Sequence, residues 1–172
     1  STAQKAEKLK VEDVTTNSFE AYQYFQKGIE NWWRWDFSGG LKNFEQAVVI
    51  DPTFAMAHLM RGRTESLLGA IPWDPFADLT SVRKSIELAK KYASKATDKE
   101  RRYIDACVAF YNRRYETADD LASDFVKRYP NDKEGTFLLG NISLFTGKYD
   151  KSIEAVGRTL EIDPPYANAY NQ

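Results

Sequence analysis

The side chains that carry most enzyme chemistry are scarce in this sequence. His58 is the only histidine and Cys107 the only cysteine among 172 residues. A serine or cysteine triad needs an imidazole beside its nucleophile, and zinc sites need several histidine or thiolate ligands. We therefore expect His58 to be a packed or a surface residue and Cys107 to be a small buried one, neither of them reactive. The sequence predicts a protein that is not an enzyme, with no catalytic residue, no metal site and no cofactor.

The charge balance argues against an electrostatic partner. Lys and Arg number 24 against 25 Asp and Glu, which leaves a net charge of −1. A basic stretch runs from 83 to 102, but a solvated helix face explains it, and nucleic-acid binding needs a broader basic surface. No apolar run approaches the roughly 20 residues that cross a bilayer. We expect no nucleic-acid partner and no membrane insertion; the compartment stays open, with cytoplasm slightly favoured over periplasm.

A period of about 34 residues organises the chain. Segments ending in Pro130 and Pro164 define one period, and Pro52 lies two periods plus a ten-residue insertion before Pro130. The period predicts repeats at 21–54, 55–98 with the insertion, 99–132 and 133–166, and the start of a fifth at 167–172. We expect 18–172 to form the repeat domain and 1–17 to be a linker or an exit from a preceding domain.

The residues within each period identify the kind of repeat. In the first repeat Gly28 is followed by Gly40, Phe44, Ala47 and Pro52, and the fourth repeats this spacing. The pattern resembles the tetratricopeptide repeat family, in which each repeat is a helix, a turn and a second helix. More loosely, it is similar to the repeat arrays attached to bacterial and archaeal signalling proteins. The resemblance implies an all-α fold, a right-handed superhelical solenoid of antiparallel helix pairs near 21–52, 55–96, 99–130 and 133–164.

Local signals agree with this register. Asn17 stands three residues before Glu20, and Thr97 stands three before Glu100, a spacing that lets side chains cap a helix start. Small residues recur at one position of every repeat, where the two helices of a repeat approach closely and a larger side chain would overpack the contact. These positions are Gly28, Gly62, Ala106 and Gly140.

The first helices carry rows of aromatic and apolar residues. In a solenoid the first helices line the concave wall, which must meet solvent, so we expect several of these rings to be partly exposed. Aromatic anchors with a few polar groups suit an extended or helical peptide. We predict a binding groove formed by Tyr22, Phe25, Ile29, Trp32, Trp33, Leu59, Arg63, Tyr103, Phe110, Phe137 and Asn141.

The proline-containing insertion is a secondary candidate. It carries Trp73 and Phe76, which either pack over the repeat or contact a partner.

The favoured function is a non-enzymatic scaffold that binds a protein or peptide segment in the groove. Two alternatives stay open. One is a regulatory or sensory segment of a larger signalling protein, and the other is a self-assembly module in which the end helices stack on another copy.

Overall fold

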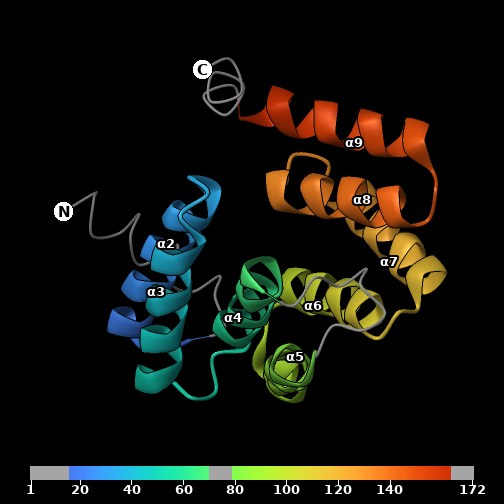
Figure 1. The fold of residues 1–172 in the computed structure, drawn as a ribbon. Coiled ribbons are helices and arrows are strands. Elements are labelled where there is room, and N and C mark those ends of the chain that lie inside the picture. The colour runs from blue at the N-terminus through green and yellow to red at the C-terminus, as the bar shows by residue number, and fades with distance from the viewer. Residues whose placement is uncertain (1–15, 70–78, 164–172) are drawn as a thin grey trace. The chain divides into compact units, whose positions relative to one another are not determined.

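The computed structural model describes residues 16–69 and 79–163 (Figure 1). This part of the chain contains eight α-helices, one short 3₁₀ helix and no β-strand. The elements are α2 (Phe19–Trp33), α3 (Phe37–Ile50), α4 (Ala55–Leu68), α5 (Thr80–Tyr92), η1 (Ala93–Lys95), α6 (Asp98–Tyr111), α7 (Tyr115–Arg128), α8 (Lys133–Phe145) and α9 (Tyr149–Ile162). The predicted all-α class is confirmed for these residues, and their eight α-helices fall near the four predicted helix-pair ranges. The expected start of a fifth repeat at 167–172 lies outside them.

The chain divides into two compact units, residues 1–104 and 105–172, with the boundary inside α6. In the first unit α2 packs along α3, α3 contacts α4, and α4 packs along α5. In the second unit α7 contacts α8, and α8 packs along α9. Helices that follow one another in sequence are therefore neighbours within each unit. A single repeat domain over 18–172 stays a prediction.

The helices begin where side chains can satisfy free backbone amides. Thr97 and Glu100 cap α6 reciprocally: the Glu100 amide donates to the Thr97 hydroxyl, and the Thr97 amide donates to the Glu100 carboxylate. At α2 the prediction was wrong by one residue. Ser18, not Asn17, is the cap, and its hydroxyl accepts from the Ala21 amide at 3.2 Å. The adjacent Thr16 hydroxyl accepts from the Ser18 amide, which fixes the cap in that register.

One turn recurs between the two helices of a pair. Trp35, Arg113 and Gly147 have positive φ angles of 63°, 58° and 72°. Arg113 and Gly147 lie one sequence period apart, and Trp35 lies two periods plus the insertion before Arg113. In each turn the next amide bonds to a carbonyl five residues back, at 2.9–3.0 Å, which closes the end of the first helix. Of these three turns, the one in the fourth repeat has glycine at this position, whereas Trp35 and Arg113 hold a conformation that L-residues disfavour by roughly 1–2 kcal/mol.

The predicted small positions lie at close helix contacts. A Cβ added to Gly28 would stand 2.5 Å from the Phe44 ring, and one added to Gly140 would stand 2.6 Å from a methyl group of Val156. Gly62 faces Ser85 of α5 in the same way, at 2.9 Å. These distances are too short for a carbon atom, so glycine is required at these three positions, whereas the third repeat has Ala106 at the equivalent position.

Replacing these glycines tests the packing register. We expect Gly28→Leu and Gly140→Leu each to lower the free energy of unfolding by about 1–3 kcal/mol, because overpacking outweighs the gain in helix propensity. Urea denaturation measures this.

Gly157→Ala in α9 is the matched control. A Cβ at Gly157 meets nothing within 4 Å, so this variant should keep its stability or gain up to about 1 kcal/mol. Unchanged midpoints for both leucine variants would contradict the register.

Candidate functional site

A buried arginine predicted for the groove contacts two other groove residues. Arg63 on α4 is only 7% exposed. Its guanidinium carbon lies 5.2 Å from the centroid of the Trp32 ring and 5.5 Å from that of Tyr103. One guanidinium nitrogen donates to the Tyr103 hydroxyl and lies 3.7 Å from the Met60 sulfur. Two aromatic faces and a hydroxyl thus stabilise a cation that burial would otherwise penalise.

The neighbouring groove residues of the first unit are more buried than expected. Phe25 packs between Phe44 and Phe54, with ring centroids 5.8 and 4.9 Å away. Leu59 has no exposed surface. Phe44 of α3 and Phe54, the residue before α4, cover the Phe25 ring, so Phe25 contributes to the core, as does Leu59.

Only part of the predicted surface on α2 remains open. Tyr22 and Ile29 are half-buried, whereas Trp33 is buried with its ring edge-on to Trp32 at 5.2 Å. Burial raises the pKa of the Tyr22 hydroxyl, which therefore stays protonated and can donate a hydrogen bond.

The second unit holds the remaining predicted residues. Phe110 is buried and makes edge contacts with Tyr115 at 5.7 Å and Phe145 at 5.1 Å. Phe137 and Asn141, both on α8, are half-buried. In this unit, Phe137 and Asn141 are the predicted groove residues whose side chains keep part of their surface accessible to a partner. Trp73 and Phe76 of the insertion lie outside the described residues.

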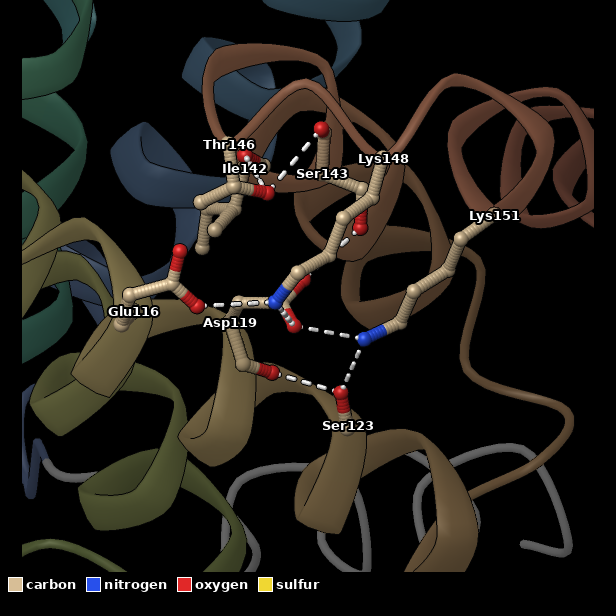
Figure 2. A network of polar contacts seen from close by, with 8 residues as sticks. All are labelled: Glu116, Asp119, Ser123, Ile142, Ser143, Thr146, Lys148 and Lys151. Carbon is tan, nitrogen blue, oxygen red and sulfur yellow. Dashed lines mark hydrogen bonds and ion pairs between the residues drawn. The ribbon is translucent and has the colours of Figure 1, made fainter.

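Sequence reasoning missed a buried polar network in the second unit (Figure 2). Its centre is Asp119 on α7, whose side chain is 3% exposed. The carboxylate accepts from the Ser143 hydroxyl at 2.9 Å, from Lys148 at 2.8 Å and from Lys151 at 2.7 Å. Lys148 also donates to Glu116 at 2.9 Å. The network ties α7 to α8, to the turn after α8 and to α9.

The charges of this network stabilise one another. Burial alone would raise the pKa of Asp119, but the hydrogen bonds from Lys148, Lys151 and Ser143 outweigh burial and hold the pKa below its usual value. Hydrogen bonds to Asp119 and Glu116 raise the pKa of Lys148. Both partners therefore remain charged at neutral pH, and the network acts as a structural tie rather than a proton donor.

His58 and Cys107 are core residues; burial was predicted for Cys107, whereas for His58 the sequence left packed and surface positions open. The His58 ring stacks on Tyr92 at 5.7 Å, and its Nε2 lies 2.9 Å from the Pro52 carbonyl oxygen. Burial lowers the pKa of His58, so the ring is neutral and Nε2 donates to that carbonyl. Cys107 is fully buried.

The described residues contain neither a metal cluster nor a membrane-spanning helix. No group of His, Cys, Asp and Glu side chains there could hold a metal ion. In residues 16–69 and 79–163, no helix combines the length and apolar composition needed to cross a membrane.

The described residues form an all-α protein of successive helices, and comparison with known proteins assigns it to no family. No family model matches the chain, and no curated protein matches it. The chain is similar to a crystal structure of MamA protein, with 22% identity, a TM-score of 0.41 and coverage of 88% of this chain and 77% of that one. MamA 41-end from Desulfovibrio magneticus RS-1 shows 15% identity, a TM-score of 0.43 and coverage of 87% and 78%. Similarity at this level supports no statement about function.

The Asp119 network predicts a pH-dependent contribution to stability. We expect Asp119→Asn to lower the free energy of unfolding by about 1–3 kcal/mol near neutral pH, because it weakens charged hydrogen bonds in a buried position. The folded-state pKa of Asp119 is lowered, so its contribution is complete above the unfolded value of about 3.9 and is lost as the pH falls through the folded value.

Urea denaturation of both proteins from about pH 7 to about pH 3 measures this difference, which should shrink at the acid end. Glu161→Gln is the control, because Glu161 forms only an exposed ion pair with Arg158 and should change little at any pH. An Asp119→Asn difference that stays constant with pH would contradict the network's role.

Proposed function

We propose that residues 18–172 form a tetratricopeptide-like array, a right-handed superhelical solenoid that acts as a non-enzymatic scaffold for protein partners. The recurrent turn at Trp35, Arg113 and Gly147 supports the repeat, because it has the same spacing as the sequence period. The crowded glycines at 28, 62 and 140 support the same register. On this proposal the first helices carry the binding surface.

The observation that carries the binding proposal is the Arg63 cluster. Arg63 is held between Trp32 and Tyr103, so its guanidinium is already oriented and largely desolvated before any partner arrives. A partner that docks on preformed side chains loses mainly its own conformational freedom. In this proposal Trp32 and Tyr103 orient the Arg63 guanidinium and do not provide the main contact area for the partner.

The half-buried groove residues are those that would contact the partner directly. Tyr22 and Ile29 in the first unit, and Phe137 and Asn141 in the second, keep part of their surface open. Aromatic rings provide contact area, while the Tyr22 hydroxyl and the Asn141 amide can pair with a peptide backbone. The ligand class that fits these groups is an extended or helical peptide segment.

Substitution of the open residues tests the binding surface. Peptides selected from a displayed random library on the immobilised protein supply the probe. We expect Tyr22→Ala and Phe137→Ala each to weaken binding by about 1 kcal/mol or more, as anchor residues do. Isothermal titration calorimetry measures affinity, and thermal melting confirms that each variant is folded.

Lys90→Ala on α5 is the control, since Lys90 is exposed on a second helix and should leave affinity unchanged. The groove proposal fails if selected peptides bind both folded aromatic variants as tightly as the parent.

A further inference from the structure

His58 lies buried between two segments of the first unit. It belongs to the first turn of α4 and is only 3% exposed. Its Nε2 lies 2.9 Å from the carbonyl oxygen of Pro52, in the turn between α3 and α4. Its ring also stacks on Tyr92, the last residue of α5, with the two ring planes 24° apart. The histidine therefore joins the α3–α4 turn to the C-terminal end of α5, which lies along α4 (Figure 1).

The second ring nitrogen of His58 lacks a hydrogen-bond partner. A carbonyl oxygen can only accept, so the neutral ring carries its proton on Nε2 and its lone pair on Nδ1. Nδ1 is buried, and no polar group of the described residues bonds to it. Protonation would place an N–H group and a positive charge where nothing accepts the hydrogen bond. Proton uptake by this ring is therefore less favourable in the folded chain than in water.

The charged groups near the ring do not compensate for its burial. Arg61 on α4 opposes a positive charge there, whereas Asp51, the C-cap of α3, favours one. From α5 the ring meets Tyr92, and Lys91 lies over that tyrosine at 5.3 Å from its centroid. In η1, Lys95 interacts with Asp51. Burial is the largest effect, and it holds the pKa of the imidazole below its usual value.

The turn that carries Pro52 is fixed by its own hydrogen bonds. The Asp51 carboxylate accepts from the amide of Thr53 at 2.9 Å and from its hydroxyl at 2.8 Å. It also accepts from the Thr16 hydroxyl at 2.6 Å. A positive ring would strengthen the bond from Nε2 to the Pro52 carbonyl, since charged donors bond more strongly. Protonation therefore leaves the contact with the turn in place.

The contact with α5 is the one that can open. Tyr92 meets the His58 ring by stacking, is itself half-buried, and is followed by exposed residues at 94 and 95. Farther along the pair, Ser85 of α5 accepts from Arg61 of α4 at 3.2 Å, which holds the middle of α5 separately. Withdrawal of the end of α5 would therefore bring Nδ1 to water without opening the whole helix pair.

We propose that His58 is an acid-sensitive latch. Uptake of a proton from solvent at Nδ1 releases Tyr92 and the last turn of α5 from α4, while the α3–α4 turn stays bonded to Nε2. The latch is a conformational device of the first unit and needs no ligand.

The pH range of the latch follows from the histidine alone. His58 is the only histidine in the sequence, and histidine is the side chain that ordinarily titrates between pH 5 and 8. Its pKa is about 6.5 in the open state and lower in the closed state. The open state therefore binds more protons, and opening becomes more favourable as the pH falls below about 6.5. Between pH 7 and pH 5 the opening constant can rise by at most about 25-fold.

Two measurements on the 172-residue chain test the latch. Proton NMR follows the single histidine ring directly, and we expect a titration midpoint below about 6.5. Amide hydrogen exchange at pH 7 and pH 5, corrected for the intrinsic rate, follows the helices. We expect the amides of residues 89–92 in α5 to open about tenfold more at pH 5 or beyond, whereas those of α8 should not change.

His58→Gln is the matched variant. Its side-chain amide can donate to the Pro52 carbonyl but does not titrate, so the difference between pH 7 and pH 5 in α5 should disappear. Tyr92→Phe keeps a stacked ring and should keep the acid response. Comparing the two pH values within each variant removes any change in overall stability.

Three results would overturn the proposal: a ring midpoint at or above about 6.5, an equal acid response in His58→Gln, or the same response in α8 as in α5. These measurements use no peptide, so the latch and the proposed binding surface fail independently.

Discussion

The fold depends on one steric constraint, the close approach of the two helices in each pair. Gly28 lies against the Phe44 ring and Gly140 against Val156, at distances that leave no room for a Cβ. The three-residue turns at Trp35, Arg113 and Gly147 return the chain at the angle that this approach needs. Since the first and third repeats tolerate Trp and Arg in a left-handed conformation, packing of the pair outweighs a local backbone cost of roughly 1–2 kcal/mol.

Much of this fold could be predicted because its signals are local or periodic. The approximate ranges of the helix pairs, the capping pair of Thr97 and Glu100 and the small positions follow from spacing alone. The exposure of Phe25 could not be read in the same way, since its burial depends on Phe44 and Phe54, which reach it from α3 and from the start of α4. The cap at α2 moved to Ser18 because Thr16 reinforces that register, a contact that a three-residue pattern does not contain.

The burial of Asp119 was not predicted, and the role of Arg63 was predicted only in part, for the same physical reason. Asp119 reads as an ordinary exposed helix residue, and only the arrival of Ser143, Lys148 and Lys151 from later in the chain makes its burial favourable. Arg63 was predicted as a polar selector in the groove, but its cation is already held by Trp32 and Tyr103. A buried charge needs partners supplied by tertiary structure, so sequence can propose the residue and not its role.

The position occupied by Asp119 also explains why the two repeats of the second unit differ. In α7 this position is polar, and the following repeat supplies a hydroxyl and two ammonium groups that satisfy it. In α9 the equivalent residue is Ile153, which is exposed and would be stabilised by contact with any apolar group. A charged residue there would need matching donors from whatever packs against it, whereas isoleucine needs none. The change from Asp to Ile therefore replaces a position that needs particular polar partners by one that any apolar side chain can cover.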